Sequence, residues 1–225
     1  MSFELKLRIT SALSEALKTN LTLTTLNFDC NSIGDNGARA LSESLKTSSN
    51  LTTLELWSNK IGNDGLLALA GALKANRTLT TLELWGNTIG DKGAQALVEA
   101  LKINSTLTTL ELWLNLIRDY GAQVLSEALK INWVLTTLDL QSNKIGDQGT
   151  QALSEALKTN STLTTLNLDN NKIGHNGALV LSKTLSEVNV ILITLTMEIN
   201  LIGVNAAQAL KHVSTITTCN ITYDN

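Results

Sequence analysis

Residues 79–102 read LTTLELWGNTIGDKGAQALVEALK, and closely similar runs recur every 28 residues along the chain. The copies open at Leu23, Leu51, Leu79, Leu107, Leu135 and Leu163, restart at Leu192 after a slip of one residue, and fade out at Ile216. A fixed period of roughly 20–29 residues with leucines at constant offsets is typical of a solenoid, in which each unit packs only on its neighbours. The repeat therefore predicts a long open surface and no enclosed catalytic pocket.

Each unit combines two hydrophobic periods. In the first half, leucines alternate with Glu83 and Trp85, and this period of two predicts a short strand with the leucines inward and the other two side chains outward. In the second half, Ala94, Leu97 and Leu101 fall at helical spacing. The unit is therefore predicted to be one strand followed by one helix.

Polar and small residues at fixed places suggest how each unit is held. Asp91 is a candidate helix N-cap, and Asn104, after the helix, is expected to adopt the left-handed C-cap conformation. A recurring glycine is expected to let each helix start lie close to the neighbouring unit; the series is Gly37, Gly65, Gly93, Gly121, Gly149 and Gly177. A recurring asparagine between buried apolar positions is expected to form a hydrogen-bonded ladder; the series is Asn31, Asn59, Asn87, Asn115, Asn143, Asn171 and Asn200.

Stacking such units gives a curved α/β solenoid. A parallel sheet of seven or eight strands is expected on the concave face and helices on the convex face, because helices (~10 Å) are wider than the strand spacing (~4.8 Å). The whole chain, 1–225, is interpreted as one domain. It comprises an N-terminal helical cap (1–22), seven repeats (23–215) and a partial repeat strand (216–225). That last strand is an exposed edge that could pair with a second copy.

The pattern carried by Leu79, Leu82, Leu84, Asn87, Ile89, Gly93, Leu97 and Leu101 resembles the ribonuclease-inhibitor type of leucine-rich repeat. The resemblance covers residues 23–213 and implies the horseshoe fold. Family members include the cytosolic inhibitor, activators of the GTPase Ran and arms of immune receptors. Protein binding is what the resemblance implies for function, and it transfers no individual functional residue to this chain.

Composition excludes several classes of function. The net charge of −3 is too small to decide a function by itself, but a basic footprint for nucleic acid is missing. No apolar run approaches the roughly 18 residues of a membrane span. Cys30 and Cys219 are expected to be too distant for a disulfide, which favours a cytoplasmic, intracellular location. Six Asn-x-Thr triplets recur with the unit, and glycosylation is the weaker interpretation. His175 and His212 lack a nucleophile partner, and no metal or cofactor motif is present, so we predict no enzyme and no cofactor.

The outward strand positions differ between units, whereas the framework positions barely vary. They predict a column of carboxylates beside a column of tryptophans on the concave face: Glu55, Glu83, Glu111 and Asp139, with Trp57, Trp85 and Trp113. Adjacent carboxylates repel, and exposed tryptophans typically mark interfaces, so the columns favour binding of a basic protein or peptide, with cation–π contacts available. The alternative is that one unit was copied twice and the stacked indoles merely stiffen the sheet.

The unit that opens at Leu107 is unusual. Leu114, Leu116 and Tyr120 replace small or polar residues, and Arg118 replaces glycine. These substitutions can be neutral changes that the repeat fold tolerates. Alternatively, Leu114 adds an apolar contact beside the tryptophan column. Two other functions stay open: a Ran-type GTPase activator, suggested by the fold, and a structural or self-associating repeat protein without a selected ligand.

Overall fold

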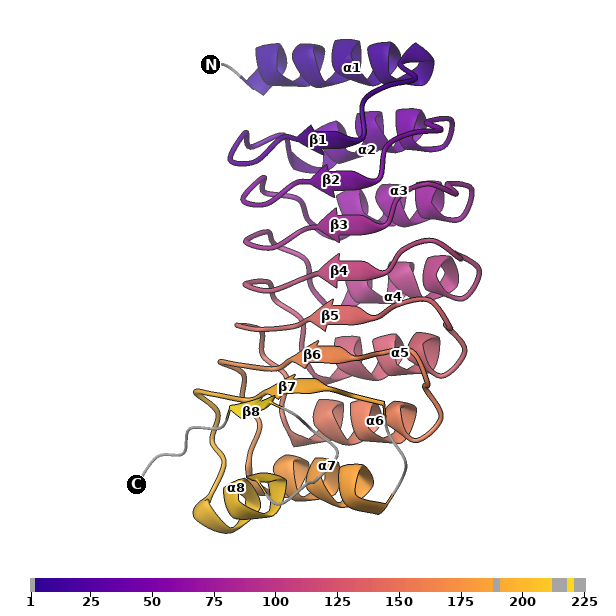
Figure 1. Ribbon diagram of the computed structural model, residues 1–225. Helices are drawn as coiled ribbons and strands as arrows, with labels where there is room; N and C mark the ends of the chain where they lie inside the picture. Colours follow the sequence, from indigo (N-terminus) through magenta and orange to yellow (C-terminus); the bar gives the residue numbers. More distant parts are fainter. Residues whose placement is uncertain (1–2, 188–190, 212–217, 221–225) are drawn as a thin grey trace.

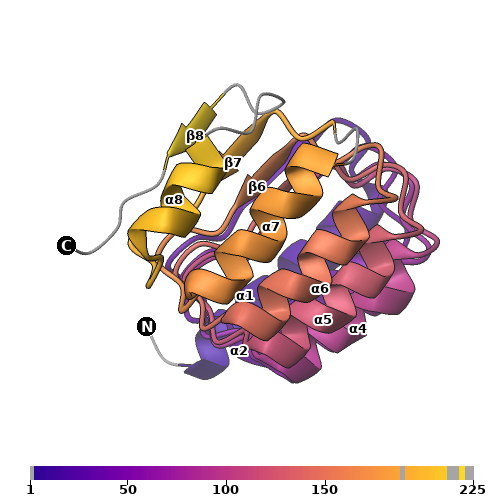
Figure 2. The same ribbon diagram turned by 90° about the horizontal axis from the view of Figure 1, so that it is seen from below.

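The computed structural model describes residues 3–187, 191–211 and 218–220, and helices and strands alternate along them (Figures 1 and 2). The helices are α1 (Phe3–Thr19), α2 (Gly34–Leu45), α3 (Asn63–Leu73), α4 (Asp91–Leu101), α5 (Asp119–Leu129), α6 (Asp147–Leu157), α7 (His175–Glu187) and α8 (Val204–Lys211). The strands are β1 (Thr25–Asn27), β2 (Thr53–Glu55), β3 (Thr81–Glu83), β4 (Thr109–Glu111), β5 (Thr137–Asp139), β6 (Thr165–Asn167), β7 (Thr194–Thr196) and β8 (Thr218–Asn220).

The strands form one parallel sheet of eight, in the order β1 to β8. Corresponding residues pair between successive units; Leu54 pairs with Leu82, and Leu82 with Leu110. All helices lie on one side of the sheet, and the row of helices extends further than the row of strands, so the sheet lines the inner side of the arc (Figure 1). This arrangement confirms the predicted solenoid. The stack bends because neighbouring strands lie closer together than neighbouring helices can.

A single continuous core lies between the sheet and the helices. The inward strand residues Leu82 and Leu84 are fully buried, as are Ala94 and Leu97 from the facing helix. Removing such side chains from water is the main stabilising contribution, because each buried leucine contributes about 2 kcal/mol. The alternation that buries the leucines also forces the intervening residues of every strand outward onto the concave face.

The predicted asparagine ladder is confirmed. The Nδ2 atom of Asn87 donates to the carbonyl oxygens of Leu56 (3.0 Å) and Leu84 (2.9 Å), one in the preceding unit and one in its own. Its Oδ1 atom accepts from the backbone amides of Asn59 (3.0 Å) and Ile61 (2.9 Å). Each buried amide therefore satisfies backbone groups of two units at once, as burial requires.

The expectation of a left-handed C-cap at Asn104 is wrong. Asn104 lies outside the positive-φ residues and is buried, and its Nδ2 donates to the carbonyl oxygen of Leu73 at 2.8 Å in the preceding unit. Asn76, Asn132 and Asn160 repeat this bond, so a second asparagine ladder runs along the helix ends. The amide nitrogens of Asn76, Asn104 and Asn160 are thus engaged, and these three Asn-x-Thr triplets do not present a free glycosylation acceptor.

The prediction that Asp91 caps its own helix is also wrong. Its Oδ1 accepts from the amides of Arg118 (2.7 Å) and Gly121 (3.0 Å), at the start of the helix in the next unit. This close approach explains the recurring glycine, as expected, because a Cβ on Gly121 would stand 2.6 Å from that oxygen. The bond couples adjacent units, and Asp35 and Asp119 accept equivalent bonds from amides of the next unit.

Replacing Asp119 by alanine is expected to lower the free energy of unfolding by about 1–2 kcal/mol, because the amides of Gly146 and Gly149 lose their acceptor. Urea denaturation followed by circular dichroism measures the change. Asp64→Ala is the matched control, since Asp64 also lies in a first helical turn but is exposed. Equal losses in the two variants would show that the helix dipole, and not the bond between units, carries the effect.

Candidate functional site

The concave face brings together the predicted carboxylates and tryptophans. Glu55, Glu83, Glu111 and Asp139 are the last residues of β2 to β5, and the ladder pairs each with the next. The tryptophans lie just beyond the ends of β2 to β4, two residues after each glutamate, and all seven residues are partly exposed. We call these seven residues, Glu55, Trp57, Glu83, Trp85, Glu111, Trp113 and Asp139, the concave patch.

The three indoles stack face to face. The ring centroids of Trp57 and Trp85 are 4.2 Å apart with an interplanar angle of 5°, and those of Trp85 and Trp113 are 4.0 Å apart at 13°. The predicted alignment is therefore present, but Trp85 has both faces covered. A cation–π contact needs a ring face, so it can form only at the outer faces of Trp57 and Trp113. The edges of the three rings form the surface of the indole column.

Two asparagines terminate the carboxylate column. The Nδ2 atom of Asn27 donates to Glu55, and that of Asn167 donates to Asp139 at 3.0 Å. Glu83 and Glu111 lie between these two ends of the column, and no side-chain amide from a neighbouring strand bonds to either of them within the described part of the chain. Sequence reasoning missed this role, although Asn27 and Asn167 occupy the same strand position as the carboxylates and so belong to the same column.

Three carboxylates of the concave patch, Glu83, Glu111 and Asp139, are poorly solvated. Burial raises the pKa of Glu83 from 4.5 to about 7, with further contributions from the negative charges of Glu111, Glu55 and Asp29. Burial also raises the pKa of Glu111. For Asp139, burial raises the pKa to about 6, although hydrogen bonds from the Gln141 amide and Asn167 oppose it. A cation beside these groups would favour their charged form and so offset both the mutual repulsion and the cost of desolvation.

Glu83→Gln is expected to raise the free energy of unfolding at about pH 8 by about 1 kcal/mol, a value reduced for solvent screening. The folded-state pKa of Glu83 lies above its ordinary value, so the folded protein binds this proton more tightly than the unfolded chain. The wild-type stability contribution is therefore complete below about pH 4.5 and is lost as the pH rises through about 7. Urea denaturation between these values should show a flatter profile for the variant than for the wild type.

Glu99→Gln is the control, because Glu99 is exposed on the helical side and pairs with Lys102. If both substitutions raised the free energy of unfolding equally at high pH, the surroundings of Glu83 would not be the cause of its effect.

Leu114 lies at the edge of the concave patch, in the turn after β4. It adopts a left-handed conformation (φ 54°), as do Ser58 and Gly86 at the equivalent positions, and it is 51% exposed. Leu116 and Tyr120 are exposed on the same edge, and Trp133 is exposed on the opposite one. A leucine that is both exposed and held in this conformation is not explained by stability.

Leu114→Asn is expected to raise the free energy of unfolding by about 1 kcal/mol, because asparagine tolerates the left-handed region better than leucine. The midpoint of urea denaturation measures the gain. Leu67→Asn provides the control at an exposed leucine in helix α3, where asparagine should instead be neutral or destabilising. A lower stability for Leu114→Asn would mean that the exposed side chain packs usefully in the free protein.

Other kinds of site are not assembled in the described part of the chain. No group of three or more His, Cys, Asp or Glu residues that could hold a metal ion occurs among the described residues. His175 is exposed at the start of α7, and His212 lies outside the described residues. None of the described helices is long and apolar enough to cross a membrane.

A profile for the family described as "Leucine Rich repeat" matches residues 19–42, 47–70, 75–98, 132–154 and 159–182, which together exceed half of the chain. The chain belongs to the leucine-rich-repeat family. The unmatched stretch between 98 and 132 contains the unusual unit with Leu114 and Arg118, yet this leucine-rich-repeat unit keeps its strand β4 and helix α5. A search of curated protein sequences found no match.

Solved structures of similar fold extend the comparison. The chain is similar to "Leiomodin-1 Actin-Binding Site 2 (ABS2)", with 24% identity, a TM-score of 0.58, and coverage of 67% of this chain and 86% of that one. It is also similar to the tropomodulin C-terminal domain of Caenorhabditis elegans, with 13% identity, a TM-score of 0.51, and coverage of 71% and 93%. At these identities the similarity shows the leucine-rich-repeat fold.

Proposed function

We propose that this chain is a protein-binding module of the ribonuclease-inhibitor type, and that the concave patch with Leu114 binds a basic protein or peptide. The observation that supports the proposal is the stacked indole column lying beside a carboxylate column on the partly exposed inner face of the sheet. Aromatic anchors beside desolvated charges are typical of interface hot spots.

Electrostatics supports a cationic partner. Two carboxylates ~5 Å apart repel by about 3 kcal/mol at an effective dielectric constant of 20. Among the described residues, no lysine or arginine forms an ion pair with Glu83 or Glu111. The ion pairs that are present lie on the helical side, as between Lys102 and Glu99. A lysine or arginine from a partner would supply the missing positive charge, so binding removes an unfavourable feature of the free protein.

Apolar contacts supply the rest of the proposed interface. The edges of the three indoles and the exposed Leu114 side chain form an apolar strip beside the carboxylates. Burial of such a strip adds affinity that does not depend on salt. The partner is therefore expected to present basic side chains next to apolar ones, and the exposed free thiol of Cys30 fits an intracellular setting.

Calorimetric titration with a decapeptide of alternating arginine and glycine tests the charge component of this proposal. Affinity should fall at least about tenfold between about 50 mM and about 300 mM NaCl, because the attraction is screened. Glu83→Gln/Glu111→Gln should weaken binding similarly at low salt. Glu99→Gln/Glu127→Gln removes two carboxylates from the helical side and serves as the control, which should bind like the wild type. Equal loss in both double variants would indicate only nonspecific attraction.

Actin is one specific protein to test, because the leiomodin structure of similar fold is an actin-binding site of that protein. Cosedimentation with actin filaments, with wild type and Trp85→Ala in parallel, measures the interaction. Binding that is lost with Trp85→Ala would assign actin to the concave patch, and binding that survives would place actin elsewhere on the surface.

A further inference from the structure

The first unit of the solenoid is incomplete on its outer side. Strand β1 pairs only with β2 among the described strands, so one edge of β1 is open. Leu23 is 38% exposed, whereas Leu51 and Leu79, at the same position in the next two units, are 2% and 0% exposed. Leu21 is 68% exposed nearby. The apolar residues that an additional strand would cover are therefore exposed at this end.

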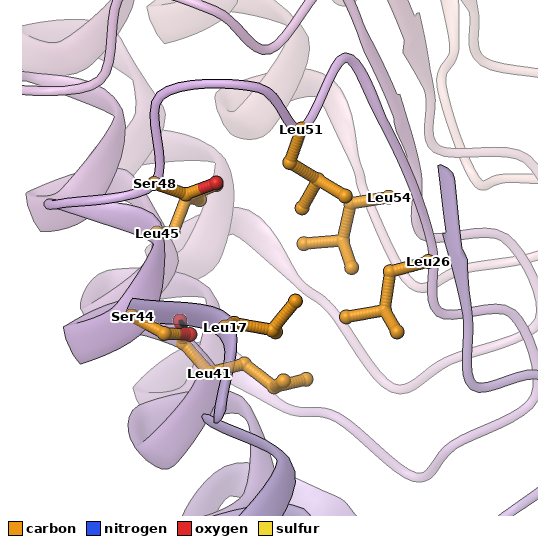
Figure 3. Close-up of a pocket in the computed structure, with 8 residues that line it drawn as sticks. All are labelled: Leu17, Leu26, Leu41, Ser44, Leu45, Ser48, Leu51 and Leu54. Carbon is orange, nitrogen blue, oxygen red and sulfur yellow. Dashed lines mark hydrogen bonds between the residues drawn. The ribbon is translucent and has the colours of Figure 1, made fainter. Parts of the chain in front are cut away.

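An apolar groove lies where the strand of a preceding unit would run. Helix α1 packs on α2 but has no strand of its own among the described residues (Figure 1). The resulting groove has a volume of about 150 Å³ and is lined by Leu13, Ala16, Leu17, Asn20, Leu23 and Leu26. Leu17 and Leu26 also line a second, much smaller cavity of about 10 Å³, together with residues of α2 and with Leu51 and Leu54, and this cavity holds at most one water molecule (Figure 3).

The hydrogen-bond ladders also end with unused donors at this groove. In later units, asparagines such as Asn76 donate to a carbonyl of the preceding unit. Asn20 occupies the same place and accepts from the amide of Leu23 at 2.7 Å, but its Nδ2 has no acceptor among the described residues. The amides of Thr52 and Thr53 donate to the Thr24 carbonyl oxygen, and the equivalent amides of the first unit face the open edge.

We propose that strand β8 of a second copy pairs in parallel with β1, so that copies associate head to tail. Every strand of the sheet runs in the same direction, so β8 of another copy meets β1 with the required polarity. Continuing the observed register, in which Thr25 pairs with Thr53 and Thr194 with Thr218, places Thr218 beside Thr25. The carbonyls on the open edge of β8 then accept from the unused donors.

The two ends complement each other in architecture. Helix α1 is a helical half-unit without a strand, and β8 is followed by no helix among the described residues. One β8 and one α1 from neighbouring copies together supply the strand and helix of a single unit. This continuation repeats contacts that already hold the solenoid together, and it favours a second copy over an unrelated peptide as the occupant of the groove.

Such an interface is heterologous, so it does not close on itself and gives open chains of increasing length. Sedimentation velocity of the wild type should therefore show a weight-average mass that rises with concentration to at least about twice that of the monomer. Leu21→Lys/Leu23→Lys should remain monomeric, because charges now flank the edge strand and its apolar groove. Leu67→Lys/Ile103→Lys, at two comparably exposed positions elsewhere, is the control and should associate like the wild type.

A mixing experiment tests the head-to-tail arrangement directly. The chain shortened by removal of residues 216–225 lacks β8 but keeps β1, whereas Leu21→Lys/Leu23→Lys keeps β8. Each should be monomeric alone, and an equimolar mixture should form dimers that do not grow further. Circular dichroism confirms that each variant is folded. A monomeric wild type, self-association of the shortened chain, or a mixture that stays monomeric would overturn the proposal.

Discussion

Asn87→Ala is expected to lower the free energy of unfolding by about 4 kcal/mol. The substitution leaves the buried carbonyl of Leu56 without its side-chain donor and the amides of Asn59 and Ile61 without their acceptor. The Leu84 carbonyl loses one donor but keeps the bond from Asn115. Buried polar groups without partners each cost about 1–3 kcal/mol. The loss affects two adjacent units, so it should exceed that of a surface hydrogen bond several-fold. Urea denaturation followed by circular dichroism measures it.

Asn36→Ala is the matched control, because Asn36 is exposed in helix α2. Its expected change is within about 0.5 kcal/mol. Since repeat proteins can unfold in segments, hydrogen exchange of the β2 and β3 amides should accompany the denaturation curves. Full retention of stability by Asn87→Ala would contradict the structural role assigned to the asparagine ladder.

Trp85→Ala is expected to weaken binding of a basic protein partner at the concave patch about 100-fold, or about 2.7 kcal/mol. Trp85 is the centre of the indole stack, and its removal deprives both Trp57 and Trp113 of a stacking neighbour. The apolar strip is then interrupted at its middle. Surface plasmon resonance with the partner obtained by affinity capture from a lysate measures the change.

Trp133→Ala is the control for that measurement. Trp133 is the fourth tryptophan of the chain, is 58% exposed, and lies on the loop between α5 and β5, away from the concave patch. Its removal should leave affinity unchanged within about twofold. If Trp133→Ala and Trp85→Ala weaken binding equally, the partner does not use the indole column, and the assignment of the site is wrong.

The repeating sequence predicted the architecture and the alignment of the concave patch. A fixed spacing of 28 residues places equivalent residues side by side once the strands pair, so Glu83 and Trp85 are aligned with their counterparts in neighbouring units. The buried asparagine at Asn87 and the glycine at Gly121 could also be predicted, because burial and close approach each restrict the choice of residue.

Interactions between units were predicted less well. Rules for helix ends assign Asp91 to its own helix and Asn104 to a left-handed turn, because these rules consider one element at a time. In the solenoid both side chains reach an adjacent unit, where Asp91 meets Gly121 and Asn104 meets Leu73. The distance between units, about 5 Å at the sheet, is shorter than the reach of these side chains.

Part of the site also required the structure. The sequence suggested cation–π contacts along the tryptophans, but the stacking distances leave Trp85 without a free face. The roles of Asn27 and Asn167 in terminating the carboxylate column depend on side-chain conformations that no repeat pattern specifies. The sequence did indicate a helical half-unit without a strand at the N-terminal end. It did not indicate that Leu23 would be left exposed in an open groove beside α1.

The most direct test of the concave patch is a nuclear magnetic resonance titration that follows the four indole N–H signals during addition of the arginine–glycine decapeptide. The signals of Trp57, Trp85 and Trp113 should shift together with one dissociation constant, and the Trp133 signal should stay in place as an internal control. Movement of Trp133 alone, or bound peptide with no change in the three stacked indoles, would contradict binding on the inner face of the sheet.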